Sequence, residues 1–413
     1  MHKPTSPTVL ILTTYPLVDP KHGGQIRAKN LVEKFKRYGW NVETIAYVDE
    51  DSPESKGPKD KIFEKNELYN SLNGEQVLFI NDLQVSKHVL KDSVFDDFIK
   101  SLPKNLDAIH VEQPWLWPLA AAYRDRINNN CVLVYGSQNI EADLKIDILK
   151  SLTGQQYSKL LKRIHLEIDN LERRASREAD IVAAVSTSDL DIIKEWVPSA
   201  RLILAPNGVE PLKPRDEDLQ KWTDRLGDLR FLLYVASAHP PNFTNFSNLI
   251  GGSLGCFPPN TKLVVVGSVS EHIYHQCAQG RFSSVNLSRL ELLFQVSNED
   301  LAAIKSLCHG FFLPIPFGGG TNLKTAEALQ SGKFVVGTKE AFRGFENYTT
   351  LPGVHVADDP TGLHSAVRYV MGTDHTPERD KRAVSELGWE SCFESLFLAV
   401  DSAIKEKRSG HLD

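Results

Sequence analysis

Two ionisable side chains, Lys324 and Glu327, follow a cluster of three glycines at 318–320. Backbone without side chains lets a ligand approach closely, and the free N–H groups of Asn322, Leu323 and Lys324 at the start of a helix would favour an anion. A cation at that end opposes the helix dipole, so a bound phosphate would explain why Lys324 is there. Glu327 lies three residues further on the same helical face, where its carboxylate could accept hydrogen bonds from sugar hydroxyls. The residue types therefore favour a ligand that carries both phosphate and sugar.

A strand, a glycine loop, a helix and a second strand are needed to position these groups. The apolar run Phe311–Ile315 predicts a buried strand, because it is short and bounded by Gly and Pro. Thr321 is the expected N-cap of a helix over TNLKTAEALQS, which Gly332 ends before a second strand, Phe334–Val336. The alternative is a tight connection between a strand and a helix, with Lys324 and Glu327 merely on its surface.

The segment FGGGTNLKTAEAL, followed by a small-residue turn and KFVV, resembles the donor site of glycosyltransferase family 4. The resemblance implies the GT-B fold, an α/β architecture of two Rossmann-like doubly wound domains that face a central cleft. Many members carry two Glu eight positions apart in this segment. The second Glu usually holds the donor ribose, and Glu327 matches it. The first usually faces the donor sugar, and Gly319 stands at that position in this chain. The resemblance therefore places Lys324, Glu327 and Gly319 at the catalytic centre, with the sugar-facing role unassigned.

The composition is that of a globular protein with more than one domain. The chain has 413 residues, of which 41% are hydrophobic and 24% charged, and this length suits two large domains. No apolar run of roughly 18 residues predicts a membrane span, and the N-terminus does not read as a signal peptide. A net charge of −6 without a basic tail argues against nucleic acid as a partner, and five scattered cysteines indicate a reducing compartment. The expected location is cytoplasmic.

The start of the chain repeats the strand–glycine loop–helix–strand order. Val9–Leu12 and Asn41–Val48 are predicted strands, and a helix is predicted over Gln25–Arg37 after the glycines Gly23 and Gly24. Ligands in open α/β sheets sit beyond the carboxyl ends of the strands, which is where this loop would lie. Gly23 and Gly24 resemble the paired glycines of the family's first loop, which border the acceptor and the donor phosphates. An ordinary turn is the alternative.

Two further strand ends carry candidate acceptor-binding residues. The strand Ala108–Glu112 runs into QPWLWP, where Trp115 could form an apolar wall for a sugar or lipid acceptor or could simply pack. The strand Cys131–Tyr135 is followed by a turn that resembles the family's His-Asn-x-Glu turn, with Gln138 where His is common and Asn139 next to it. Because Gln cannot be charged, hydrogen bonding to the substrate is the expected role of Gln138.

The middle of the chain contains a long amphipathic helix and the domain boundary. The helix predicted over Tyr157–Ala179 has a basic face that could touch an anionic membrane carrying a lipid-linked acceptor, although a solvated face is the alternative. A Val-Ser-x-x-Asp segment followed by the Pro-Asn-Gly-Val of Pro206–Val209 is typical of family 4 and closes the first domain. The expected domains are 1–210 for the acceptor, 211–377 for the nucleotide sugar, and 378–413 as a terminal helix crossing back toward the first domain.

The second domain supplies the remaining predicted donor contacts. The strand Phe231–Ala236 leads into SAHPPN, which resembles the family's first loop of this domain; relatives use this loop on the donor phosphate or sugar. The loop after the predicted strand Leu292–Val296 is where relatives hold the base by backbone contacts, although it could equally be an ordinary helix start. The resemblance thus implies a donor set of Gly24, Ser237, His239, Val296, Gly320, Thr321, Asn322, Leu323, Lys324 and Glu327, and an acceptor set of Gly23, Glu112, Trp115, Gln138 and Asn139.

By this resemblance, the expected activity is that of a retaining glycosyltransferase of the hexosyltransferase type. It would move a sugar from a nucleoside diphosphate sugar to a hydroxyl of a glycan, a lipid-linked acceptor or a small molecule. Helix N–H groups and Lys324 could stabilise the leaving diphosphate, so neither a cofactor nor a metal is expected. The alternatives are a non-catalytic subunit that binds without turnover and a nucleotide-sugar epimerase. The latter is disfavoured because it needs paired acid and base groups.

Overall fold

The computed structural model describes residues 6–50, 52–63, 71–72, 75–76, 80–153, 159–198, 201–238, 240–244, 246–317, 321–378 and 384–409. The chain forms two compact units. One consists of Met1–Pro206 together with Cys392–Asp413, and the other of Asn207–Ser391.

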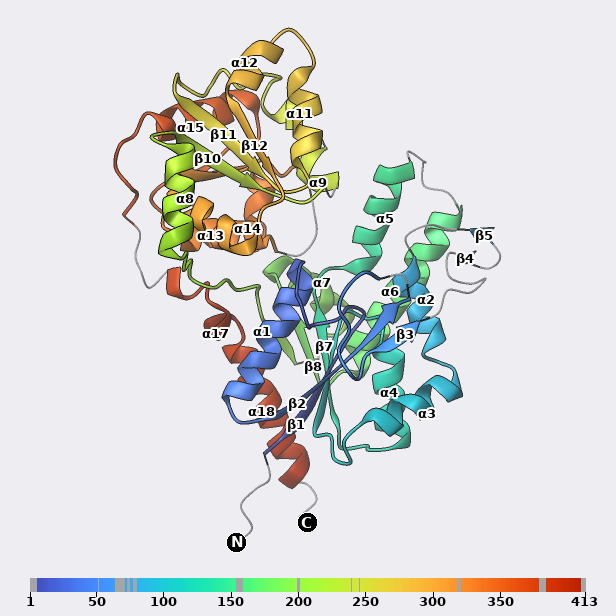
Figure 1. The fold of residues 1–413 in the computed structure, drawn as a ribbon. Helices are drawn as coiled ribbons and strands as arrows, with labels where there is room; N and C mark the ends of the chain where they lie inside the picture. Colours follow the sequence, from blue (N-terminus) through green and yellow to red (C-terminus); the bar gives the residue numbers. More distant parts are fainter. Residues whose placement is uncertain are drawn as a thin grey trace. The chain divides into compact units, whose positions relative to one another are not determined.

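The first unit alternates strands and helices (Figure 1). Its elements are β1 (Thr8–Thr13), α1 (Gly23–Arg37), β2 (Asn41–Asp49), β3 (Lys61–Phe63), β4 (Ser71–Leu72), β5 (Glu75–Gln76), α2 (Asn81–His88), α3 (Asp92–Ser101), β6 (Ala108–Glu112), α4 (Trp117–Arg126), β7 (Val132–Ser137), α5 (Glu141–Thr153), α6 (Lys159–Glu178), β8 (Ile181–Ala184), α7 (Thr187–Trp196), β9 (Leu202–Leu204) and α18 (Glu394–Ser409).

A seven-stranded parallel sheet forms the centre of this unit. Its order is β3-β2-β1-β6-β7-β8-β9, so the direction of winding reverses between β1 and β6. Leu10 of β1 lies between Glu43 of β2 and Ile109 of β6. The run from Val9 to Leu12 is fully buried, as expected for a strand covered on both faces.

Helix α18 lies near the C-terminal end of the sequence but packs on the sheet of the first unit. It contacts β7, β8 and β9. Its Phe397 ring lies 6.0 Å from the Phe35 ring and 5.3 Å from the Trp40 ring, and its Glu394 Oε2 accepts a 2.6 Å hydrogen bond from Lys34 Nζ. Figure 1 shows it in red among the elements of the first unit.

The expectation of one terminal helix from residue 378 is wrong for the described part of that segment. Gly388 forms a parallel β-bridge with Val209, and only after it do the short helix α17 (Trp389–Cys392) and then α18 begin. A Cβ atom at Gly208 would lie 2.5 Å from Trp389 N, so glycine is required for the two backbones to approach this closely.

The second unit is built in the same way. Its elements are α8 (Asp216–Leu226), β10 (Arg230–Val235), α9 (Pro240–Phe243), α10 (Phe246–Leu249), β11 (Thr261–Val266), α11 (Ser270–Ala278), α12 (Ser283–Ser288), β12 (Leu290–Phe294), α13 (Asn298–Leu307), β13 (Gly310–Leu313), α14 (Leu323–Gln330), β14 (Phe334–Gly337), η1 (Lys339–Phe342), η2 (Glu346–Tyr348), β15 (Val354–Val356) and α15 (Pro360–Met371).

Its six-stranded parallel sheet has the order β12-β11-β10-β13-β14-β15, which reverses between β10 and β13. One face of the sheet packs on α10, α11 and α15 through residues such as Ile273 and Val367. The other face packs on α8, α13 and α14 through Trp222, Ile304 and Leu329. Helices therefore cover both faces, and each unit is a doubly wound α/β fold (Figure 1).

No helix in the described ranges is both long and apolar enough to cross a bilayer. The predicted amphipathic helix is present as α6, with Ile164 and Ile168 fully buried on its apolar stripe. Residues 157 and 158, where its start was predicted, lie outside the described residues.

Candidate functional site

The first candidate site lies where the winding of the second sheet reverses. Strands β10 and β13 are parallel neighbours, so the segments that follow them leave the same edge of the sheet. The segment after β10 carries Ser237 and Asn242, and the segment after β13 leads into α14. Such a reversal leaves room beyond the carboxyl ends of the strands, which is where open α/β sheets bind ligands.

Asn322, and not the predicted Thr321, is the N-cap of α14. The Asn322 backbone is extended, with φ −97° and ψ 104°, and its Oδ1 accepts a 3.3 Å hydrogen bond from the N–H of Lys324. Thr321 Oγ1 instead accepts a 2.6 Å hydrogen bond from Asn207 Nδ2. Asn is one of the strongest N-cap residues, and the Thr321 hydroxyl is engaged by Asn207 instead.

Lys324 extends from the first turn of α14 to the segment after β10. Its Nζ lies 3.3 Å from Asn242 Oδ1, while Asn242 Nδ2 donates to the Ser237 carbonyl at 2.9 Å and the Asn242 carbonyl accepts from Tyr234 Oη at 2.5 Å. The Lys324 ammonium is therefore held by a side chain that is itself anchored to the sheet. The structure brings Lys324 and Ser237, both predicted from sequence, to one place through Asn242.

The charge of Lys324 is poorly compensated. Burial lowers the pKa of its ammonium below the usual 10.5, and nearby Lys305 lowers it further, while Glu327 raises it. Within the described residues Lys324 forms no ion pair at 4 Å or less. A partly buried ammonium without an ion-pair partner is costly, and a bound anion would reduce that cost.

Glu327 is paired with a residue that the sequence analysis did not identify. Its Oε2 accepts a 2.7 Å hydrogen bond from Nζ of Lys305, whose side chain is 9% exposed against 34% for Glu327. Lys305 lies on α13, and no motif links it to Glu327 in the sequence. The pair fixes one carboxylate oxygen of Glu327 near the first turn of α14.

The other predicted donor residues divide into two groups. His239, Gly319 and Gly320 lie outside the described residues. Val296 follows β12, which β11 separates from β10 in the sheet, and Leu323 packs against the apolar cluster beneath α14.

The second candidate site lies at the corresponding reversal of the first sheet, between β1 and β6. Here α1 begins at Gly23, immediately after the segment that follows β1. A Cβ atom at Gly24 would lie 2.9 Å from Gln138 Oε1 and 3.1 Å from Tyr15 Oη. Gln138 follows β7, so three segments meet at the first turn of α1.

Glu112, at the end of β6, lies beneath this meeting point and is 1% exposed. Its Oε2 is 3.5 Å from Arg27 Nε and accepts a hydrogen bond from Gln138 Nε2, and its Oε1 is 3.0 Å from His110 Nε2. Burial alone would raise the pKa of this carboxyl, but Arg27, His110 and Gln138 outweigh it and lower the pKa to about 2. Glu112 is therefore ionised at neutral pH, and Arg27 and Tyr15 are residues of this cluster that sequence reasoning missed.

Two of the predicted acceptor residues have other contacts in the structure. Trp115 is 1% exposed and belongs to an apolar cluster with residues of α2, α5 and α6, among them Leu83 and Ile146. Asn139 Nδ2 donates to Glu141 Oε1 at 3.1 Å. The structure thus brings together Gly23, Gly24, Gln138 and Glu112, whereas Trp115 occupies a packing position.

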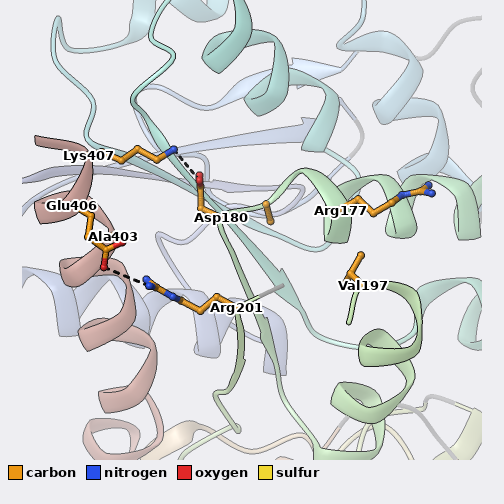
Figure 2. Close-up of a pocket in the computed structure, with 8 residues that line it drawn as sticks. Arg177, Asp180, Val197, Arg201, Ala403, Glu406 and Lys407 are labelled. Atoms are coloured by element: carbon orange, nitrogen blue, oxygen red, sulfur yellow. Dashed lines mark hydrogen bonds and ion pairs between the residues drawn. The ribbon is translucent and has the colours of Figure 1, made fainter. Parts of the chain in front are cut away.

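A cavity of about 440 Å³ in the first unit lies elsewhere (Figure 2). Its lining includes Asp180 and Arg201, which precede β8 and β9, so it is at the amino ends of those strands. Arg201 pairs with Glu406 at 3.4 Å and Lys407 with Asp180 at 2.8 Å, and dashed lines mark both pairs in Figure 2. Its facing charges are largely matched with each other, which leaves little to attract a charged ligand.

No protein-family model matches this chain. No curated protein matches it either.

Solved structures do resemble it. Sucrose-phosphate synthase from Thermosynechococcus elongatus is 16% identical, covers 99% of this chain and 98% of its own, and superposes with a TM-score of 0.60. The catalytic domain of starch synthase IV from Arabidopsis thaliana, bound to ADP and acarbose, is 14% identical over 98% of this chain and 100% of its own, with a TM-score of 0.61. HepE from Anabaena in complex with UDP is 16% identical over 98% of this chain and 100% of its own, with a TM-score of 0.55.

These likenesses span almost the whole chain, and their low identity restricts them to the fold. Together with the two doubly wound sheets, they show that the chain has the GT-B fold with two Rossmann-like domains.

Proposed function

We propose that the chain is a retaining glycosyltransferase that moves a sugar from a nucleoside diphosphate sugar to an acceptor hydroxyl. The observation that carries the proposal is Lys324, a partly buried ammonium at the first turn of α14 whose described surroundings contain no ion-pair partner. A donor diphosphate would supply that partner. The nucleotides bound in similar structures, UDP in HepE and ADP in starch synthase IV, belong to the same chemical class and support the proposal.

The proposed chemistry needs stabilisation of the leaving group. As the bond between the anomeric carbon and the diphosphate breaks, negative charge accumulates on the diphosphate oxygens. Lys324 lies in the first turn of α14, where the helix dipole also favours an anion, and fixed charges and dipoles of this kind are among the strongest contributors to catalysis. Asn242 keeps the ammonium in that place without neutralising it.

Glu327 has the second role in the proposal. Lys305 holds one of its carboxylate oxygens at 2.7 Å, which fixes the orientation of the carboxylate. The carboxylate would then accept hydrogen bonds from the ribose hydroxyls of the donor. An acceptor-only group suits a vicinal diol, which has two hydrogens to donate.

The test is calorimetric titration of the protein with UDP, GDP and ADP. Lys324→Ala should weaken the nucleoside diphosphate that the wild type binds by about 1.5–3 kcal/mol, because it removes a hydrogen bond between two charged groups. Lys339→Ala, which removes an exposed lysine of the same unit, is the matched control and should leave affinity unchanged. If the wild type and Lys324→Ala bound the nucleoside diphosphate equally well, Lys324 would not be part of the binding site.

A second candidate, a binding subunit without turnover, is favoured by Gln138. Its amide occupies the position beside Glu112 and Gly24, and an amide cannot transfer a proton at neutral pH. Incubation with the nucleotide sugar that binds best distinguishes the two. Release of free nucleoside diphosphate, in water or with an acceptor, indicates an enzyme, whereas tight binding without release indicates the subunit.

A further inference from the structure

The last turn of α18 is attached to the first sheet by charges, whereas the turns before it are attached by apolar packing. Ile404 is 2% exposed, and beyond it the three consecutive residues Glu406, Lys407 and Arg408 all form ion pairs with residues outside the helix. Glu406 pairs with Arg201, which directly precedes β9. Successive residues of a helix point about 100° apart, so these three side chains leave α18 in different directions and reach different strands.

Two aspartates receive the cations of this turn, and each also bonds to the sheet. Asp107, directly before β6, has its Oδ1 at 2.8 Å from Arg408 Nη2, and its Oδ2 accepts a 2.8 Å hydrogen bond from the first N–H of β1. Asp180, directly before β8, has its Oδ1 at 2.8 Å from Lys407 Nζ, and its Oδ2 accepts a 2.8 Å hydrogen bond from the N–H of Leu133 on β7. Both carboxylates are therefore held by the sheet itself, so the receiving half of the contact does not depend on α18.

A buried thiol lies at the strand start between these two aspartates. Cys131 directly precedes β7, which lies between β6 and β8 in the sheet, and it is fully buried. Burial raises the pKa of the Cys131 thiol to about 12, with Lys407 acting to lower this pKa and the two aspartates acting to raise it. Because the thiolate is the reactive form of cysteine, the thiol is protected both by its burial and by its pKa.

The ion pairs of the last turn are accessible to dissolved salt. The side chains of Lys407 and Asp180 are 28% and 25% exposed, and a cavity of about 440 Å³ borders both (Figure 2). An ion pair with this exposure shifts an equilibrium by about fivefold or less, and dissolved ions screen it. The apolar contacts that hold the preceding turns are not screened in this way. Salt should therefore loosen the last turn and leave the rest of α18 attached.

We propose that the last turn of α18, residues 406–408, is a latch that opens while the rest of the helix stays on the sheet, and that its opening exposes Cys131 to solvent. Since Asp107 and Asp180 remain bonded to the sheet, the latch closes again without refolding of its receiving site. The reactivity of this one thiol is then set by the ionic strength and by the latch, and does not require unfolding of the first unit. The inference does not depend on the proposed transferase function.

The experiment alkylates the full wild-type chain with iodoacetamide, an uncharged reagent, and quantifies each cysteine by peptide mass spectrometry. All five cysteines are free and buried, so each reports on its own surroundings in the same sample. Between about 20 mM and about 500 mM NaCl, alkylation of Cys131 should accelerate about three- to tenfold, the effect of screening its ion pairs. Cys392, which is 6% exposed and ends α17 just before α18, should keep a constant rate, because the apolar end of the helix stays in place.

Lys407→Met and Arg408→Met remove the two cations and keep long side chains. At low salt each should accelerate alkylation of Cys131 about two- to fivefold, and the double variant should lose most of the salt dependence. Loss of the Lys407 charge would by itself raise the pKa of the thiol and slow alkylation, so a faster reaction has to come from opening of the latch. Lys405→Met is the matched control, because Lys405 pairs with Asp401 of its own helix at 2.6 Å, and it should leave the rate unchanged.

Two results would overturn the proposal. A rate at Cys131 that neither salt nor the two variants change would show that the ion pairs do not govern access to the thiol. Rates at Cys131 and Cys392 that rise together would show that the whole helix or the whole unit opens, with no separate latch. The salt series on the wild type decides between these outcomes even if a variant fails to fold.

Discussion

Lys324 and Glu112 are both ionisable side chains at the reversal point of a parallel sheet, but their surroundings differ. Glu112 has Arg27 at 3.5 Å, and its pKa is lowered to about 2. Lys324 has only the neutral Asn242 amide at 3.3 Å, and its pKa is lowered, which disfavours its charged form. A compensated charge serves the structure, whereas an uncompensated one is available to a ligand.

Lys324 should couple ligand binding to proton uptake. Its pKa in the free protein lies below 10.5 because of burial, and a bound diphosphate would raise it by favouring the ammonium. Affinity should therefore fall as pH rises through the free-state pKa, with protons taken up on binding in that range. Calorimetry in two buffers of different ionisation enthalpy measures the uptake. Lys324→Arg keeps the charge but does not titrate, so the same uptake in that variant would contradict the assignment.

Glu112→Gln should destabilise the first unit by about 3–5 kcal/mol at pH 7, because Arg27 would lose its buried counter-charge. The folded pKa of about 2 lies below the ordinary 4.5, so the stabilisation by Glu112 is fully present above pH 4.5 and is lost as pH falls toward 2. The difference in free energy of unfolding between the wild type and Glu112→Gln should therefore shrink between pH 4.5 and pH 2. Urea unfolding at pH 7, 5 and 3 measures this difference. Glu33→Gln, at a half-exposed glutamate of α1, is the control. A difference in free energy of unfolding that stays constant from pH 7 to pH 3 would argue against an ionised Glu112.

At the scale of elements, the start of α14 connects local stability to the proposed site. Asn322→Ala should cost about 1 kcal/mol in α14 and also weaken nucleoside diphosphate binding, since the cap holds the first turn in shape. Asp359 caps α15 in the same way, with its side chain accepting from the N–H of Gly362. Asp359→Ala should therefore cost a similar stability without weakening binding. Hydrogen exchange measures the stability of each helix, and calorimetry measures the affinity for the nucleoside diphosphate. Equal losses of affinity in Asn322→Ala and Asp359→Ala would contradict a contact between α14 and the ligand.

Strands buried on both faces were predictable, because a short apolar run has few alternatives in an α/β chain. Ala108–Glu112 has the predicted bounds and is buried throughout, whereas the predicted strand Leu292–Val296 is displaced by two residues, since β12 spans Leu290–Phe294. The helix after the Trp-rich segment was not predicted. Trp117 and Pro118 open α4, and the Trp117 indole N–H donates to Glu178 at 2.8 Å, a contact that depends on tertiary folding.

For the candidate sites, the sequence indicated Lys324, Glu327, Gly24 and Gln138 through motifs. It could not indicate Lys305, Arg27 or Tyr15, because their roles depend on distances between segments far apart in the chain. Arg27 shows the difficulty most clearly. A basic residue in an amphipathic helix is normally expected on the solvated face, but this one is 1% exposed and donates to the Ala205 carbonyl at 2.8 Å.

At the scale of the whole molecule, the first unit is made from two separate stretches of chain. Phe397→Ala on α18 should destabilise this unit by about 3–5 kcal/mol, because the ring is 6% exposed and packs on Phe35 and Trp40. Leu398→Ala on the same helix is the matched control, since Leu398 is 55% exposed and should cost little. Hydrogen exchange should show faster opening in β7, β8 and β9 for Phe397→Ala alone, with the second unit unchanged. Equal effects of the two variants would mean that α18 does not stabilise the sheet through Phe397.

The late arrival of α18 has a consequence for biosynthesis. A ribosome delivers all seven strands of the first sheet, then the entire second unit, and only afterwards the helix that covers β7, β8 and β9. Throughout that interval the nascent chain carries an uncovered apolar surface, the kind of surface that chaperones bind and that leads to aggregation. The second unit, which is continuous in sequence, can finish folding first. The first unit can therefore be completed only after the whole second unit has been translated.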